Sequence, residues 1–143
     1  GRMPVTVFAV ETKPAGCAMK TAMQAHVIAP YSDAQVSMTF SALVRHGQED
    51  RTVIAGEDGT LVSSGPSLSR QRVELHTEAG VARPELRGDW FTNGFQGTMA
   101  ELLCAIEEDR EPDNSAAGNL RSLAFCFAAI RSAEAEVPRA PLM

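Results

Sequence analysis

The segment of the chain best suited to bind a small molecule runs from Gly88 to Phe95. It holds the only tryptophan of the sequence and two of its six phenylalanines, together with amide and hydroxyl side chains. Aromatic faces beside hydrogen-bonding groups suit a small polar ligand or the face of a sugar. The same side chains would equally suit a hydrophobic plug over a core. The sequence leaves these two interpretations of the segment open.

No set of side chains has the spacing of a catalytic site. His26 and His76 lie alone on expected strands, where a histidine usually serves as a hydrogen-bonded structural residue. Three pairs of neighbouring carboxylates fall in expected turns or at a helix end, where acidic residues keep a surface soluble: Glu49/Asp50, Glu57/Asp58 and Glu107/Glu108. We therefore predict no catalytic residue in this chain.

The cysteines and glycines point to no site either. Cys104 falls on the polar side of an expected helix, but no histidine is placed nearby to activate its thiol. Together with Cys17 and Cys126 it makes an odd number of cysteines without a C-x-x-C pair, which fits reduced thiols in a cytoplasm and no metal site. Glycines within 94–97 could cradle a phosphate before a helix, yet no strand directly precedes them, so a sharp turn into the helix explains them better.

The first two-thirds of the chain is expected to form strands. The clearest alternation lies in Gln35–Val44, where one face is polar but uncharged, with Gln35, Ser37, Thr39 and Ser41. The segment Val5–Val10 is apolar on both faces, which predicts a strand covered on both sides. Tight turns without intervening helices predict a largely antiparallel sheet. Its other strands are expected at Met23–Ala29, Arg51–Ala55, Thr60–Ser64, Gln71–Thr77 and Val81–Leu86.

Two helices are expected after the strands. The first begins at Phe95 and ends before Pro112, with an apolar face made by Phe95, Thr98, Met99, Leu102, Leu103 and Ile106. The second runs from an N-cap at Asn114 or Ser115 to about Glu134. Because this helix is apolar nearly all round, it is expected to be buried on both sides, with a main stripe of Leu120, Leu123, Phe127 and Ile130. The fold class is therefore α+β, with two C-terminal helices packed on one face of the sheet.

Length and composition exclude several classes of function. A chain of 143 residues suits a single domain over positions 1–143. Its 18 acidic and 13 basic residues give a formal charge of −5, which makes nucleic acid a poor partner. No apolar run approaches the roughly 18 residues of a membrane span, and no targeting segment is seen, so a cytoplasmic location is expected.

The C-terminal third resembles the substrate domain of the Gfo/Idh/MocA oxidoreductases, the glucose–fructose oxidoreductase and inositol dehydrogenase family. The helical part of the resemblance is carried by residues 89–103, 105–108, 110–112, 119–123 and 129–133. The strand part is carried by residues 50–56 and 59–61. Taken together, the resemblance extends over essentially the whole chain.

The resemblance implies the back half of an enzyme. Members of the family have an N-terminal Rossmann domain for NAD(P) and a C-terminal α/β domain with a large, mostly antiparallel sheet, as in the C-terminal domain of glyceraldehyde-3-phosphate dehydrogenase. The cofactor fingerprint, the Glu-Lys-Pro motif and the catalytic histidine of the family lie upstream of this chain. The run Thr12-Lys13-Pro14 lacks the glutamate and is not that motif. No catalytic, cofactor-binding or metal-binding residue is therefore transferred, and the isolated chain is expected to be inactive.

For the full-length protein the resemblance implies NAD or NADP as cofactor and a sugar, polyol or similar hydroxylated substrate. If this domain contributes to the substrate pocket, the candidates are Trp90, Asn93, Phe95 and Gln96. The expected partners are the protein's own N-terminal Rossmann domain and further copies of the chain, which would meet through the uncharged sheet face. The alternative is a stand-alone, non-catalytic binding or dimerisation module of the same fold.

Overall fold

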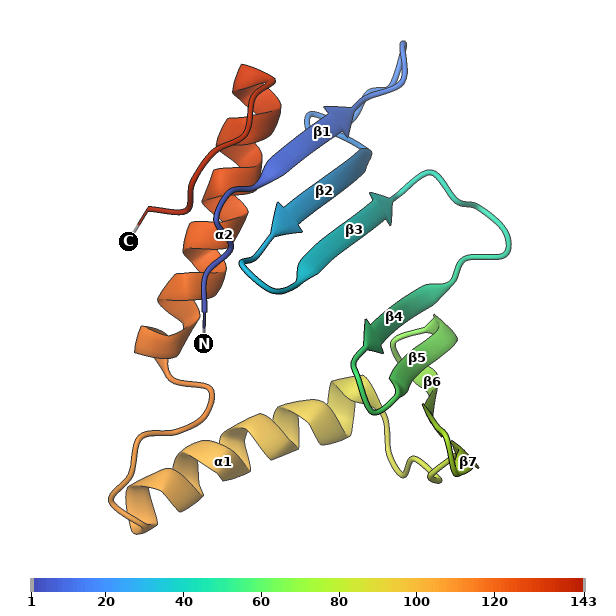
Figure 1. Cartoon of the computed structure of the whole chain (residues 1–143), viewed down its shortest axis with the longest axis vertical. Helices are drawn as coiled ribbons and strands as arrows, with labels where there is room; N and C mark the ends of the chain where they lie inside the picture. The colour runs from blue at the N-terminus through green and yellow to red at the C-terminus, as the bar shows by residue number, and fades with distance from the viewer. Residues whose placement is uncertain (1, 143) are drawn as a thin grey trace. The chain divides into compact units, whose positions relative to one another are not determined.

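The structure, a computed structural model, describes residues 2–142 and divides the chain into two compact units (Figure 1). The first unit combines the residues up to Leu43 with those from Asp113 onward, and the second comprises Val44–Pro112. Each unit has its own antiparallel sheet and one α-helix. The α+β class with antiparallel sheets is therefore confirmed. That both units belong to one domain remains a prediction.

The first unit contains a three-stranded sheet in the order β1-β2-β3. Its strands are β1 (Phe8–Thr12), β2 (Gln24–Pro30) and β3 (Gln35–Ser41). Each pairs with the next in antiparallel register, so that Val10, His26 and Thr39 lie side by side. The three strands lie within two to three residues of their predicted positions, because the alternation that defines them is also the alternation that the sheet requires.

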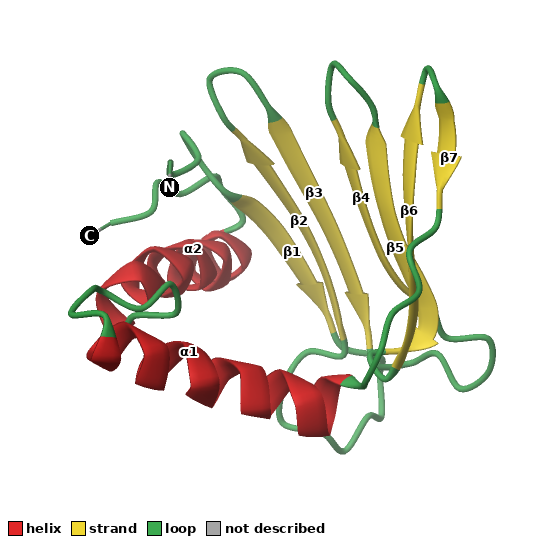
Figure 2. Ribbon diagram, turned by 90° about the horizontal axis from the view of Figure 1, so that it is seen from below, coloured by secondary structure: helices red, strands yellow, loops and turns green. Residues whose placement is uncertain are grey.

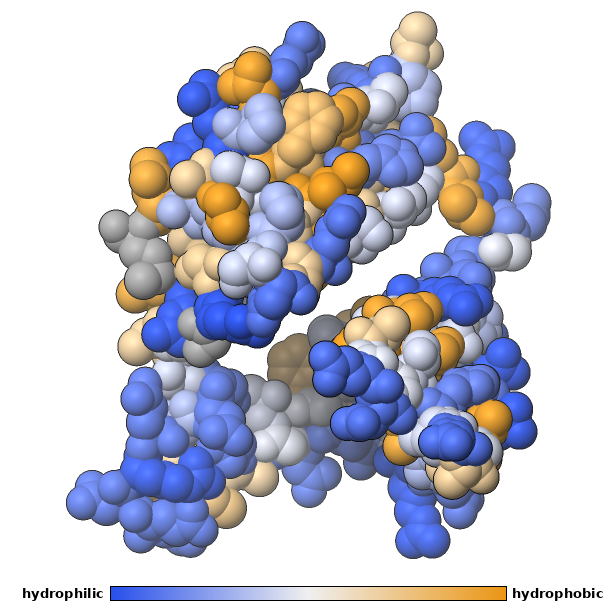
Figure 3. Space-filling model, in the orientation of Figure 1, coloured by the Kyte–Doolittle hydropathy of each residue, from blue (hydrophilic) through white to orange (hydrophobic). Residues whose placement is uncertain are grey.

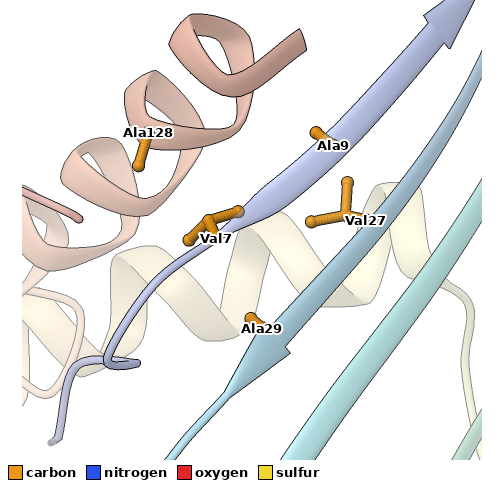
Figure 4. Packing of buried hydrophobic residues seen from close by; sticks show 5 residues of the cluster. All are labelled: Val7, Ala9, Val27, Ala29 and Ala128. Atoms are coloured by element: carbon orange, nitrogen blue, oxygen red, sulfur yellow. The ribbon is translucent and has the colours of Figure 1, made fainter. Parts of the chain in front are cut away.

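Helix α2 (Ala116–Ala135) lies along one face of this sheet (Figures 1 and 2). It begins at Ser115, one of the two predicted N-caps, whose Oγ accepts a hydrogen bond of 3.0 Å from the backbone N–H of Gly118. The core beneath it is small, and Figure 4 shows its side chains converging between helix and strands: Val7, Ala9, Val27, Ala29 and Ala128.

The prediction that α2 is buried on both sides is wrong. The helix turns its small residues Ala124, Ala128 and Ser132 to the sheet, and these three are buried. Its other side is exposed at 43–60%, and this is the predicted main apolar stripe of Leu120, Leu123, Phe127 and Ile130. Small side chains let the helix backbone approach the strands closely, and hydropathy alone does not detect this preference. Figure 3 shows apolar side chains reaching the surface where α2 lies in Figure 1.

The outer edge of β1 is covered by the C-terminal residues of the same unit. Val7 and Arg139 exchange two backbone hydrogen bonds of 2.8 Å, and the backbone N–H of Ala9 donates to Ser132. These contacts satisfy edge groups that would otherwise be open to another strand. The expectation that the first strand is covered on both faces is wrong, however, because Phe8 and Val10 remain 37% and 47% exposed.

The second unit contains a four-stranded antiparallel sheet in the order β4-β5-β6-β7. The strands are β4 (Asp50–Ala55), β5 (Thr60–Ser67), β6 (Arg70–Thr77) and β7 (Gly80–Ala82). A tight turn joins β4 to β5, closed by a hydrogen bond of 2.9 Å from the N–H of Gly56 to the carbonyl of Gly59. A register shift between Ser64 and Ser67 bends β5 against β6.

The second unit ends in two consecutive helical segments. A π-helical turn, η1 (Trp90–Gly94), leads directly into α1 (Phe95–Glu107). Helix α1 ends with Asp109 in the left-handed conformation, at φ 50°. The N–H groups of Asp109 and Arg110 then bond back to the carbonyls of Ile106 and Ala105, the pattern of a Schellman motif. Within residues 2–142, no helix is long and apolar enough to cross a membrane.

Candidate functional site: the aromatic turn before helix α1

The turn that carries the predicted substrate-binding residues is held by two local hydrogen bonds. Asp89 caps it, since its Oδ1 accepts a hydrogen bond of 2.9 Å from the N–H of Thr92. The N–H of Asp89 donates in turn to Oδ1 of Asn93, also at 2.9 Å. Gly88 adopts φ +89°, and a Cβ there would lie 2.6 Å from the Asn93 side chain. The polar groups of the segment thus fix the conformation of its backbone.

Three aromatic rings gather on this turn. Trp90 meets Phe91 and Phe95 edge to face, with ring centroids 5.2 and 5.7 Å apart, and Phe91 lies 6.0 Å from Phe95. All three side chains are about half exposed or more. Trp90 and Phe95 also line a cavity of about 210 Å³ with Gly94 and Thr98. Pockets that hold small ligands usually measure roughly 300–1,000 Å³, so this cavity is one wall of a site rather than a complete one.

The four predicted substrate-binding residues lie in different surroundings in the structure. Trp90 and Phe95 line the cavity. The side chain of Asn93 is used to close the turn, and Gln96 is exposed on the first turn of α1. The contribution of each to substrate binding remains a prediction.

The strand pairing of the described residues differs from that of a sheet that holds a nicotinamide cofactor. Such a cofactor is held at the carboxyl ends of parallel strands, by a glycine-rich turn that opens a helix. All strand pairs between residues 2 and 142 are antiparallel. Over the same residues, no three histidine, cysteine, aspartate or glutamate side chains lie close enough together to hold a metal ion.

The second sheet carries a charged cluster that was not predicted from the sequence. The half-buried carboxylate of Glu74 accepts a hydrogen bond of 2.7 Å from Arg83 Nε and lies 3.1 Å from His76 Nε2. The hydrogen bond from Arg83 holds the pKa of Glu74 below its usual range, and the hydrogen bond with His76 adds a smaller effect in the same direction. The i, i+2 spacing of Glu74 and His76 on one strand was the available signal, because such residues share a face.

The exposed face of the first sheet carries no charged side chain. The strand register confirms that Gln35, Ser37, Thr39 and Ser41 share this face. It also places six further side chains and Pro30 beside them: Phe8, Val10, Thr12, Gln24, His26 and Ile28. The Thr39 hydroxyl lies 3.3 Å from Nδ1 of His26, within hydrogen-bond distance. An exposed sheet face normally carries Lys and Glu, so this face has the composition of a contact surface.

Comparison with known proteins identifies the fold. No family model and no curated protein matches the sequence. Among solved structures, an oxidoreductase from Agrobacterium radiobacter, in complex with NAD+, L-tartaric acid and magnesium, superposes with a TM-score of 0.80 at 18% identity, over 96% of this chain and 43% of that one.

Two further solved structures have the same fold. The WlbA dehydrogenase from Bordetella pertussis, in complex with NADH and UDP-GlcNAcA, matches with a TM-score of 0.72 at 19% identity, over 99% of this chain and 40% of that one. The aldose-aldose oxidoreductase from Caulobacter crescentus, complexed with glycerol, matches with a TM-score of 0.78 at 18% identity, over 96% of this chain and 41% of that one.

The chain thus has the fold of the C-terminal domain of these oxidoreductases, as the resemblance to the Gfo/Idh/MocA proteins implied. It spans less than half the length of each of the three solved structures.

Proposed function

We propose that this chain is the C-terminal, substrate-positioning and oligomerising domain of an NAD(P)-dependent oxidoreductase that acts on a sugar, polyol or related hydroxylated molecule. The observation that carries the proposal is the superposition of nearly the whole chain on part of each of several oxidoreductases, two of which contain NAD+ or NADH. In such an enzyme the nicotinamide supplies the hydride chemistry, and this domain supplies binding and orientation.

The aromatic turn is the part of the domain that we assign to the substrate. Trp90 and Phe95 present exposed ring faces beside a small cavity, and such faces pack against the C–H groups of a hydroxylated ring. A cavity of about 210 Å³ needs a second wall to enclose a sugar. In this proposal the protein's own N-terminal Rossmann domain supplies that wall.

Two uncovered surfaces support the proposed partners. The outward stripe of α2 exposes Leu120 and Phe127 at 60% and 58%, which suits burial against a further domain of the same protein. The uncharged face of β1–β3 suits a second copy of the chain, because bringing it against itself creates no repulsion between like charges. We also propose a reducing, cytoplasmic location, which the three free cysteines support.

Steady-state kinetics of the full-length protein with a panel of aldoses, polyols and sugar acids tests the substrate assignment. Trp90→Ala should raise KM by about tenfold, a loss of about 1.4 kcal/mol, with little change in kcat or melting temperature. Phe91→Ala is the matched control, because Phe91 belongs to the same aromatic cluster but does not line the cavity. An unchanged KM with a lowered melting temperature for both variants would instead establish the hydrophobic plug.

A further inference from the structure

A cavity lies at the end of the second sheet where β5 turns into β6, and it shares no lining residue with the cavity at the aromatic turn. It measures about 460 Å³, which is within the roughly 300–1,000 Å³ of sites for small molecules. Its lining comes from the residues before β4 and from the β5–β6 hairpin: Gln48, Glu49, Ser64, Gly65, Pro66, Arg70, Gln71 and Arg72.

Arginines surround a buried hydroxyl at this end of the sheet. The register pairs Ser64 on β5 with Arg51 on β4 and with Arg72 on β6, so the three side chains lie in one row on the same face. Ser64 is only 6% exposed, and its Oγ accepts a hydrogen bond of 3.2 Å from Arg72 Nε. Arg70, two residues before Arg72 on the same strand, shares this face and lines the cavity. Three positive charges thus lie around one hydroxyl.

The guanidinium groups that line the cavity have no carboxylate partner. Within residues 2–142, the side chain of Arg70 makes no hydrogen bond or ion pair, and that of Arg72 makes only its hydrogen bond to Ser64. Glu49 is the one carboxylate in the lining, and its Oε1 lies 3.9 Å from Arg51 Nη1, beyond hydrogen-bond distance. Both side chains of that pair are more than half exposed, so it neutralises little of the positive charge.

The carboxylates of the adjoining strand positions are engaged elsewhere. Asp50 lies one position before the row, so its side chain points to the opposite face, where Oδ2 accepts a hydrogen bond of 3.1 Å from Gln71. Glu74 shares the face of the arginines, but its oxygens bond to Arg83 and His76. Like charges on neighbouring strands repel one another, and an anion between them would remove this repulsion.

We propose that this cavity binds the phosphate group of a small molecule such as a phosphate ester, with Arg70, Arg72 and the Ser64 hydroxyl as donors. The oxygens of a phosphate are arranged as a tetrahedron and accept from several directions, whereas a planar carboxylate is matched by one guanidinium fork. A phosphate ester carries a charge of about −1.5 to −2 at pH 7, which balances more than one arginine. Arg51, which stands beside Ser64 outside the lining, adds its charge.

Isothermal titration calorimetry of the full-length protein with inorganic phosphate tests this site. The wild type should bind phosphate saturably, and Arg70→Gln should raise the dissociation constant by about tenfold, since it removes a charged donor. Because the Arg70 side chain is exposed, this substitution should leave the melting temperature unchanged. Arg87→Gln, in the loop after β7, removes the same charge outside the cavity and is the matched control. Acetate at the same ionic strength should bind at least about tenfold more weakly than phosphate.

Each contrary outcome overturns a stated part of the proposal. Absence of phosphate binding by the wild type overturns the site altogether. An unchanged dissociation constant in Arg70→Gln places the bound phosphate elsewhere in the protein and overturns the assignment to this cavity. Equal weakening by Arg70→Gln and Arg87→Gln reduces the effect to net charge and overturns the same assignment. Equal affinity for acetate overturns phosphate as the ligand class.

Discussion

The hydroxyl of Ser132 on α2 accepts a hydrogen bond of 3.0 Å from the backbone N–H of Ala9 on β1. Both residues are buried, at 0% and 2% exposure, although they lie 123 positions apart in the sequence. Since this N–H points away from β2, no neighbouring strand can satisfy it, and a helix side chain serves instead. The bond joins the two ends of the chain into one unit.

Removing this hydroxyl should destabilise the first unit. Ser132→Ala leaves the Ala9 N–H buried without a partner, which should lower the free energy of unfolding by about 1–3 kcal/mol. Urea denaturation followed by circular dichroism measures the change. Ser122→Ala, at an exposed position of the same helix, should change the stability by less than about 0.5 kcal/mol. Equal effects of the two substitutions would show that the Ser132 bond contributes nothing.

Two glycines should respond in opposite directions to the same substitution. At Gly65, in the irregular part of β5, a Cβ would lie within contact distance of the Arg70 backbone, so Gly65→Ala should destabilise the protein by about 2 kcal/mol or more. At Gly97, inside α1, a Cβ would meet nothing within 4 Å. Gly97→Ala should therefore stabilise the protein by about 1 kcal/mol. A neutral result at Gly65 would contradict the close approach of β5 and β6.

A substitution at the C-terminus of α1 should increase the stability of the protein. Asp109 occupies the left-handed conformation that the Schellman motif requires and that glycine adopts without steric cost. Asp109→Gly should raise the melting temperature, with a gain of about 1 kcal/mol, and Asp109→Val should lower it. If the two substitutions changed the melting temperature in the same direction, the backbone conformation assigned to Asp109 would be wrong.

The Glu74 cluster should make the stability of the second sheet depend on pH. The pKa of Glu74 is held below its usual range, mainly by the hydrogen bond from Arg83. The folded state therefore favours the ionised carboxylate, and this contribution is complete at neutral pH and is lost as the pH falls through the lowered pKa. Glu74→Gln should flatten the fall of the melting temperature between pH 6 and pH 3. Glu78→Gln, in the β6–β7 turn, should leave that fall unchanged.

The periodicity of the sequence predicted the strands well, because alternation along a strand is a local property. Of the predicted strand Gln35–Val44, residues Gln35–Ser41 form β3 with the expected faces. Of the two predicted N-caps, Asn114 and Ser115, it is Ser115 that caps α2. The orientation of α2 was not predictable from hydropathy, since both sides of the helix are apolar. What decided it was size, because Ala124, Ala128 and Ser132 allow close approach to the strands.

The candidate site was only partly visible in the sequence. Aromatic and amide residues marked the 88–95 segment as a candidate site, but the sequence did not predict its π-helical turn. That conformation depends on two hydrogen bonds accepted by the side chains of Asp89 and Asn93. Asn93 was predicted as a binding residue from its type alone, and the hydrogen bond that its Oδ1 accepts from the Asp89 N–H could not be foreseen. Its part in substrate binding remains a prediction. The backbone hydrogen bonds between Val7 and Arg139 cover the edge of the first sheet. The two residues are too far apart in the sequence for local patterns to predict this contact.

The central claim, that these residues complete an NAD(P)-dependent oxidoreductase, is tested most directly by a fluorescence titration of the full-length gene product with NADH and NADPH. The account predicts saturable binding of at least one of the two nucleotides by the full-length protein, and no binding by residues 1–143 alone. A full-length protein that binds neither nucleotide at millimolar concentration would contradict it and would favour a stand-alone module of the same fold.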